Sequence, residues 1–196
     1  LCSIMGGQLD IDIVKKCRVI DIELNHKEFI PNKPGLTRLR HKTGVFGKPL
    51  LGAILKPKII INENILLEMV KQVVDGGVNW IKEDEIMANP NCLPLQKRVD
   101  VLHNYLKDHP QVCYHFCING DSPYLLERAK IVNDSGNGIH VNFWSGFGAH
   151  KMIRDICPDI LMHFQKSGDK ILTDASHRFG IDWNVLCDLV GRFTDT

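Results

Sequence analysis

The chain has 196 residues, of which 44% are hydrophobic and 24% are charged, and its formal net charge is +1. These values describe a folded globular protein with one sizeable core, and they exclude an intrinsically disordered chain. Because the net charge is close to zero and no basic run stands out, we expect neither nucleic acid nor an acidic membrane surface as a partner. No apolar stretch approaches the ~20 residues that a membrane-spanning helix requires.

The cysteines indicate a reducing compartment. There are seven, none in a Cys-x-x-Cys pair: Cys2, Cys17, Cys92, Cys113, Cys117, Cys157 and Cys187. An odd number without motif spacing favours buried thiols over a disulfide framework. Since no signal-peptide pattern opens the chain, we expect a cytoplasmic or organelle-stroma location. The chain starts at Leu1 without an initiator methionine, which we interpret as the start of a fragment or a processed piece.

The first 46 residues differ in pattern from the remainder. Short apolar runs at Ile13–Val14, Cys17–Ile20 and Ile22–Leu24 predict small helix and strand pieces, and Gly35 to Lys42 predicts a helix. From Pro49 onward, short apolar runs alternate with helical patterns. This alternation predicts βαβ units and a parallel sheet.

Five strands are expected in the second part, at residues 50–55, 78–81, 112–118, 138–143 and 160–164. Helices are predicted to begin at Asn62 or Asn64, near Pro94, and at Ser122-Pro123. A fourth helix carries Met152 and Ile153, and residues 165–179 are expected to be irregular before a last helix around Trp183. Five such units at intervals of about 22–34 residues fit a (β/α)₈ barrel, although a doubly wound sheet would give the same pattern.

Charged residues stand at the ends of the first two expected strands. Lys56-Pro57-Lys58 follows the first, and Lys82-Glu83-Asp84-Glu85 follows the second. Because side chains alternate along a strand, we expect Lys82 and Asp84 on one face, with Glu85 reaching in from the loop. Such a cluster can hold a metal ion. In the plain alternative, the lysine stays protonated and pairs with the carboxylates.

These motifs resemble the large subunit of ribulose-1,5-bisphosphate carboxylase/oxygenase (RuBisCO) and its non-carboxylating relatives, the RuBisCO-like proteins. The resemblance lies in Pro49 to Lys58, in Gly76 to Glu85 and in Ser3 to Gly7. It continues downstream mainly through the order of strands and helices. It implies a (β/α)₈ TIM barrel preceded by a small α+β domain. Residues 1–46 would be the end of that domain, and residues 47–196 the first five βα units of the catalytic barrel.

The resemblance also implies a metal centre. In the family, the lysine that matches Lys82 reacts with CO₂ to form a carbamate, which turns a cation into an anionic oxygen ligand. Carbamylated Lys82, Asp84 and Glu85 would then bind Mg²⁺, which prefers oxygen ligands. Mg²⁺ bound to the carbonyl and hydroxyl of a phosphorylated ketose would stabilise the enediolate.

Three further residues receive roles from the same resemblance. Lys56 would contact the substrate and transfer protons near the enediolate, Lys58 would support Lys56 and the metal ligands, and His163 would bind the substrate. The plain alternatives are solvated or phosphate-steering lysines and a neutral imidazole packed at a strand end. For the pair His115 and Cys117, interior packing is the preferred interpretation because no third metal ligand converges with them.

Other positions differ from the carboxylase pattern. Gly7 stands where carboxylases carry an asparagine, Ile54 replaces a small hydroxyl residue, and Phe164 follows His163 where carboxylases usually have an arginine that holds a phosphate. We therefore expect a RuBisCO-like protein that catalyses Mg²⁺-dependent enolisation or isomerisation of a phosphorylated ketose.

Several alternatives remain open at this point. The first is a true carboxylase, and the second is a non-catalytic truncated fragment. The third is a barrel aldolase with Lys82 or Lys56 as a Schiff-base lysine. Because the last three barrel units are missing from this sequence, we expect the chain alone to be inactive. The resemblance also implies a homodimer whose N-terminal domain completes the partner's active site.

Overall fold

The computed structural model describes residues 5–23, 35–57 and 62–196. The elements in chain order are η1 Gly7–Asp10, β1 Cys17–Val19, α1 Gly35–Thr43, β2 Gly52–Ile54, α2 Glu63–Asp75, β3 Trp80–Lys82, α3 Leu95–Lys107, β4 Cys113–Cys117, α4 Ser122–Asn133, β5 Gly138–Asn142, η3 Phe143–Ser145, α5 Phe147–Ile156, β6 Leu161–Gln165, α6 Lys170–Thr173, β7 Phe179–Ile181 and α7 Trp183–Gly191. None of the helices in the described ranges is long and apolar enough to cross a membrane.

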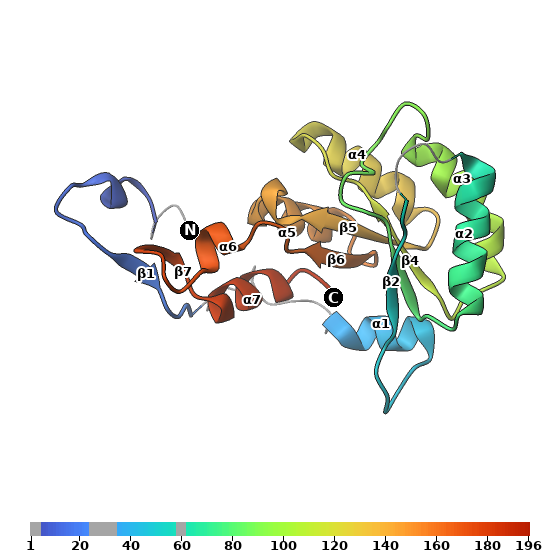
Figure 1. Ribbon diagram of the computed structural model, residues 1–196, viewed down its shortest axis with the longest axis horizontal. Helices are drawn as coiled ribbons and strands as arrows, with labels where there is room; N and C mark the ends of the chain where they lie inside the picture. Colours follow the sequence, from blue (N-terminus) through green and yellow to red (C-terminus); the bar gives the residue numbers. More distant parts are fainter. Residues whose placement is uncertain (1–4, 24–34, 58–61) are drawn as a thin grey trace.

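A parallel sheet of five strands lies in the part of the molecule that also holds α2 to α5 (Figure 1). The strand order is β2-β3-β4-β5-β6, so each strand lies beside the next one in the sequence. A doubly wound sheet reverses its strand order, whereas a barrel does not. The observed order, with the strands curled as in half of a barrel, therefore confirms the predicted α/β fold.

The five predicted strands all form, with shifted ends. β2 begins at Gly52 rather than Leu50, and β3 extends to Lys82, so that this lysine belongs to the strand itself. Gly52 is required by packing: a Cβ at this position would lie only 2.0 Å from the ring of Trp80. The predicted cap at Asn62 is confirmed, because its side chain accepts a hydrogen bond from the backbone N–H of Ile65 at 3.0 Å.

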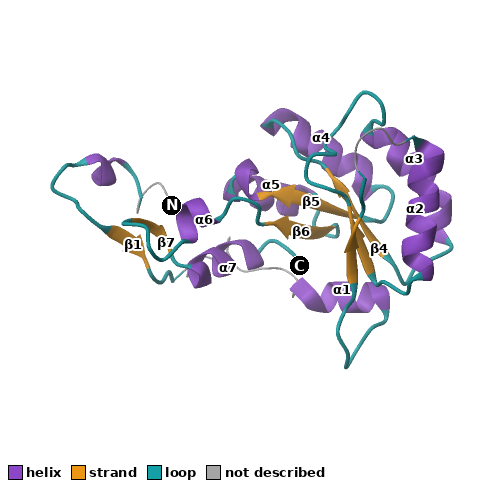
Figure 2. Ribbon diagram, viewed as in Figure 1, coloured by secondary structure: helices purple, strands orange, loops and turns teal. Residues whose placement is uncertain are grey.

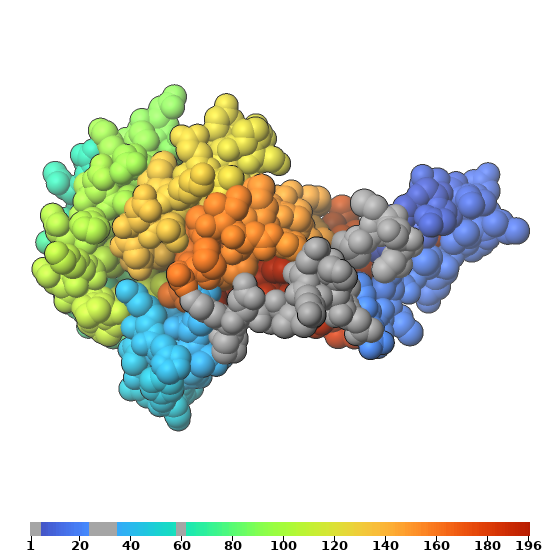
Figure 3. Space-filling model, turned by 180° about the vertical axis from the view of Figure 1, so that it is seen from behind, coloured from blue at the N-terminus to red at the C-terminus, as the bar shows by residue number. Residues whose placement is uncertain are grey.

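Residues 165–179 are not irregular throughout, and that expectation was wrong in two places. They contain the short helix α6 and the start of β7, which pairs in parallel with β1. The resulting two-stranded sheet lies at one end of the elongated molecule (Figure 2), the end at which the blue N-terminal segment projects in Figure 3. The apolar run at Cys17–Ile20 was expected to form a short helix or strand piece, but its pairing joins residues 162 positions apart, such as Cys17 and Phe179, and no local pattern indicates it. The boundary at residue 46 stays a prediction.

The outer face of the five-stranded sheet forms the main core. Its side chains pack against helices α2 to α5, and they include Ile81, Tyr114, Phe116, Ile139 and Met162, each essentially inaccessible to solvent. Burial of this apolar surface supplies the main driving force for folding.

The inner face is more polar. Near its N-terminal end, Leu39 of α1 packs with Cys113 and Leu161. Further along, it carries His115 on β4, His140 on β5 and His163 on β6. The rings of His115 and His140 lie 5.9 and 6.4 Å from the ring of His163. Burial lowers the pKa of His115 to about 3 and that of His140 well below its usual value. These two imidazoles are therefore neutral at physiological pH.

A buried ion pair joins β3 to α3. The Glu83 carboxylate accepts hydrogen bonds from Arg98 Nε at 2.9 Å, from the Tyr114 hydroxyl at 3.0 Å and from the Cys117 backbone N–H at 2.7 Å. Both members of the pair are inaccessible, at 1% and 0% exposure. Burial raises the pKa of Glu83, and the Arg98 guanidinium opposes that rise. The three donors hold the loop after β3 against the helix layer.

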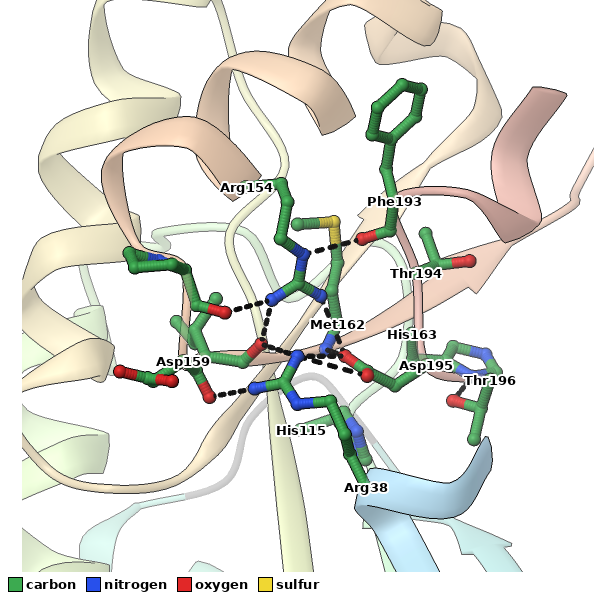
Figure 4. A network of polar contacts seen from close by, with 12 residues as sticks. Arg38, His115, Arg154, Asp159, Met162, His163, Phe193, Thr194, Asp195 and Thr196 are labelled. Carbon is green, nitrogen blue, oxygen red and sulfur yellow. Dashed lines mark hydrogen bonds and ion pairs between the residues drawn. The ribbon is translucent and has the colours of Figure 1, made fainter. Parts of the chain in front are cut away.

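A second ionic cluster joins α1 and α5 to the segment after α7 (Figure 4). The Asp195 carboxylate, with a side chain only 2% exposed, accepts hydrogen bonds from Arg38 of α1 at 3.1 Å and from Arg154 of α5 at 2.8 Å. It also accepts one from the backbone N–H of Met162 at 2.8 Å. One carboxylate therefore fixes α1, α5 and β6 relative to one another.

We expect Arg98→Met to destabilise the fold by about 3–5 kcal/mol, because it leaves the Glu83 carboxylate buried without its cation. Lys97, the neighbour of Arg98 in α3, offers a matched control, since it forms an exposed ion pair with Glu63 of α2. Lys97→Met should cost less than about 1 kcal/mol. Urea unfolding of both variants measures the difference, and equal costs would contradict the importance of the buried pair.

We expect stability to fall as the pH decreases from about 6.5 toward 4. An unfolded histidine binds a proton below about pH 6.5, whereas folded His115 does so only near pH 3, so the unfolded state holds more protons in this range. Each such histidine contributes a slope of up to ~1.4 kcal/mol per pH unit. His115→Gln should reduce the slope measured by urea unfolding at several pH values. An unaltered slope in His115→Gln would refute the assignment.

Candidate active site

Lys82 lies at the C-terminal end of β3 and is only 2% exposed. Its Nζ donates a hydrogen bond to the Glu83 carbonyl at 3.2 Å and lies 3.9 Å from Glu85 Oε2. Burial lowers the pKa of this lysine, although the nearby carboxylates of Glu85 and Asp84 oppose that effect. Because its pKa is lowered, a larger fraction of Lys82 than of a surface lysine is present as the neutral amine at a given pH.

Asp84 follows on the same face and is fully buried. Its Oδ2 lies 2.6 Å from the Nζ of Lys56, which follows β2, and its Oδ1 accepts the backbone N–H of Ile86 at 3.1 Å. The Lys56 side chain is 58% exposed, so the pair joins a buried carboxylate to a lysine open to solvent. The structure thus brings Lys56, Lys82 and Asp84 together, as the sequence predicted.

Glu85 is the most accessible of the three proposed metal ligands, with a side chain 34% exposed. Its Oε1 accepts a hydrogen bond from the Ser167 hydroxyl at 3.4 Å. Its backbone carbonyl accepts the Asn119 side-chain amide at 2.8 Å, and the Oδ1 of Asn119 in turn accepts the Asn142 backbone N–H at 2.9 Å. Asn119, in the loop after β4, therefore links the loop after β3 to the end of β5.

Sequence reasoning missed Asn119 and Ser167. Asn119 and Gly120 directly follow the expected strand at residues 112–118. A polar residue at the end of a strand could have indicated that Asn119 belongs to the site. Asn142 ends β5, and its side chain caps the turn that follows by accepting the Trp144 backbone N–H at 2.9 Å. Trp144 remains 64% exposed and lies against Gly168.

His163 lies on the inner face of β6. Its ring packs on Trp80, with centroids 5.2 Å apart, and its Nδ1 is 2.9 Å from Thr196 Oγ1. Burial lowers the pKa of His163 to about 4, with further repulsion from Lys82 and an opposing contribution from the Gln165 side chain. The imidazole is therefore neutral at physiological pH.

Other predicted positions can be located as follows. Lys58 lies outside the described residues, as does the first part of the Ser3–Gly7 motif. Gly7 begins η1, and Ile54 ends β2 with 48% exposure. Cys117 is buried, accepts the Ala88 backbone N–H and donates to the Glu85 carbonyl, which agrees with the packing interpretation.

The donor set suits Mg²⁺ only if Lys82 is modified. Among the described residues, no group of three or more His, Cys, Asp or Glu side chains is arranged to hold a metal ion. Asp84 and Glu85 offer two carboxylates beside Lys82, and a carbamate on that lysine would add the third anionic oxygen ligand. The buried amine with its lowered pKa fits this requirement, since the neutral amine is the form that reacts with CO₂.

The sequence is similar to a known protein family and to curated enzymes. The profile of a family described as the ribulose bisphosphate carboxylase large chain, catalytic domain, matches residues 35–193. A 3-oxo-isoapionate-4-phosphate decarboxylase from Rhizobium etli is 30% identical over 181 residues, which cover 86% of this chain and 43% of the relative. A 2,3-diketo-5-methylthiopentyl-1-phosphate enolase from Microcystis aeruginosa is 28% identical over 131 residues, 64% of this chain and 34% of the relative.

Solved structures agree on the fold. A rubisco-like protein from Burkholderia fungorum superposes with a TM-score of 0.84 at 24% identity, over 97% of this chain and 50% of its own. A dimeric archaeal Rubisco from Hyperthermus butylicus gives a TM-score of 0.87 at 20% identity, over 98% of this chain and 48% of its own. The half-barrel described above thus matches part of the TIM barrel of these proteins.

The chain spans less than half the length of the two curated relatives. The family profile, however, covers most of the chain and includes both strand ends that carry the lysines and carboxylates. The chain belongs to the RuBisCO large-chain family, among whose members it is similar to RuBisCO-like proteins as well as to RuBisCOs.

Proposed function

We propose that the whole protein catalyses Mg²⁺-dependent enolisation of a phosphorylated ketose, as a RuBisCO-like enzyme of the enolase or isomerase type. The observation that carries the proposal is the cluster at the ends of β2 and β3. There the Lys56 ammonium lies 2.6 Å from the buried Asp84 carboxylate, and Lys82 Nζ lies 3.9 Å from Glu85. Active sites of (β/α)₈ barrels lie at this end of the strands.

Lys82, once carbamylated, Asp84 and Glu85 are the residues that would hold Mg²⁺. The bound ion would supply Lewis acidity toward the ketose carbonyl and stabilise negative charge on its oxygen. Ser167 and Asn119 orient Glu85 through its side chain and its carbonyl. In this arrangement the Glu85 carboxylate stays accessible to a bound substrate, while Asp84 stays buried.

The proton transfers would be carried by lysines. The carbamate oxygen on Lys82 would accept the proton next to the ketose carbonyl. Lys56, with 58% of its side chain exposed, can turn from Asp84 toward the substrate and donate or accept later protons. Lys58 would support Lys56, and neutral His163 would hydrogen-bond a substrate hydroxyl.

The names of the two relatives support this substrate class. Each name contains a phosphorylated compound with an oxo or diketo group. One relative is named as a decarboxylase of such a compound and the other as an enolase. A carbonyl beside an acidic C–H or a carboxylate is the common requirement of both reactions. We therefore propose a phosphorylated keto compound as the substrate.

Carboxylation of ribulose 1,5-bisphosphate is the second candidate, and the family profile favours it because that profile describes the carboxylase large chain. Gly7, Ile54 and Phe164 weigh against it, since none can supply the hydrogen bond or the charge expected at those positions of a carboxylase. We also propose a homodimer, with the N-terminal domain at the partner's active site, in the cytoplasm or an organelle stroma.

The carbamate can be tested directly. With ¹³CO₂ and Mg²⁺, we expect the whole protein to show one carbamate carbon signal by ¹³C NMR, and Lys82→Met to lose it. Lys56→Met serves as the control, because it removes a lysine of the same cluster that carries no metal ligand in this proposal. Loss of the signal in Lys56→Met with retention in Lys82→Met would assign the carbamate to Lys56 and contradict the proposal.

The reaction is tested with labelled CO₂ and ribulose 1,5-bisphosphate in heavy water, with carbon fixation and C3 proton exchange followed together. We expect exchange without fixation, and Lys82→Met should reduce exchange by at least ~10²-fold, in the range of a lost acid–base group. Fixation would instead establish the carboxylase. If neither occurs, the same exchange assay with a phosphorylated diketone decides between another keto substrate and a non-catalytic protein.

A further inference from the structure

Thr196 lies directly beside His163 in the sheet. Its backbone N–H donates to the Met162 carbonyl at 3.4 Å, and its carbonyl accepts the Phe164 N–H at 2.7 Å. This is the pattern of a parallel pair, in which residues opposite each other direct their side chains to the same face. The Thr196 hydroxyl is accordingly 2.9 Å from His163 Nδ1.

The segment that carries Thr196 is held on both sides (Figure 4). Asp195 binds Arg38 of α1 and Arg154 of α5, and its backbone N–H donates to the Met162 carbonyl at 2.6 Å. Thr194 is also buried, and its hydroxyl donates to the Val190 carbonyl at 3.1 Å. These contacts hold the backbone around Thr196 in place, and they therefore fix the position of its hydroxyl beside β6.

Besides Thr196, the described neighbours of His163 are the Gln165 side chain, whose hydrogen bond opposes the lowering of the His163 pKa, and three aromatic rings. Trp80 packs against the imidazole at 5.2 Å, and the neutral rings of His115 and His140 lie 5.9 and 6.4 Å away. These contacts limit where the ring can lie, but they distinguish poorly between its two flipped orientations because both present a similar flat surface. A directional hydrogen bond at Nδ1 does distinguish them.

We propose that Thr196 is a positioning residue for His163: it engages Nδ1, fixes the orientation of the ring, and leaves Nε2 as the nitrogen that meets the substrate. The Arg38–Asp195–Arg154 cluster acts through Thr196 by holding its backbone beside β6. The role of His163 toward the substrate rests on the proposed function, whereas the control of its ring by Thr196 does not.

The test is ¹⁵N NMR of the histidine side chains in the whole protein, without any ligand, with His163→Asn used to assign the signal. Thr196→Val removes the hydroxyl at nearly constant volume and should move the His163 Nδ1 and Nε2 signals toward each other, as in a ring that exchanges between states. Thr196→Ser keeps the hydroxyl and should restore the wild-type signals. Thr194→Val, which removes a hydroxyl two residues away, should leave them unchanged.

If the ¹⁵N signals of Nδ1 and Nε2 of His163 are already averaged in the wild-type protein, the proposal is overturned without any variant. The proposal can therefore be refuted even if Thr196→Val fails to fold. Unchanged His163 signals in folded Thr196→Val would overturn it as well. Proton exchange on ribulose 1,5-bisphosphate is measured separately. If the NMR result holds while no exchange occurs, the proposed function fails and the positioning role of Thr196 stands.

Discussion

Three consecutive charged residues at the end of β3 are almost inaccessible to solvent, and the surrounding structure is arranged to compensate them. Lys82, Glu83 and Asp84 are 2%, 1% and 0% exposed. An unpaired charge in such a place costs several kcal/mol, so each needs a partner. Because side chains alternate along the strand, the partners come from opposite sides of the sheet.

On the outer side, Glu83 is met by Arg98, Tyr114 and a backbone N–H, which join β3 to α3 and β4. On the inner side, Asp84 pairs with Lys56, which follows the neighbouring strand β2. Lys82 has no carboxylate closer than 3.9 Å among the ion pairs of the described residues, and burial lowers its pKa. The outer pair stabilises the fold, while the inner residues keep a buried amine beside two carboxylates.

The neutral histidines of the inner face belong to the same electrostatic arrangement. His115 and His163 lose their charge through burial, and the nearby Lys82 disfavours their protonation further. A neutral ring can donate or accept one hydrogen bond at each nitrogen, so its orientation decides what it offers. For His163 that orientation depends on Thr196, and Thr196 depends on the Asp195 cluster, which reaches back to α1.

The sequence by itself determined the five βα units, a helix cap at either Asn62 or Asn64, and the gathering of Lys56, Lys82, Asp84 and Glu85. Local periodicity and the alternation of side chains along a strand are properties of short segments. The tertiary structure alone decided the pairing of β1 with β7, the contact of Thr196 with His163 and the cluster around Asp195. Each of these joins residues far apart in the chain, 157 positions for Arg38 and Asp195. No local pattern encodes such a distance, and only packing of the whole chain brings the partners together.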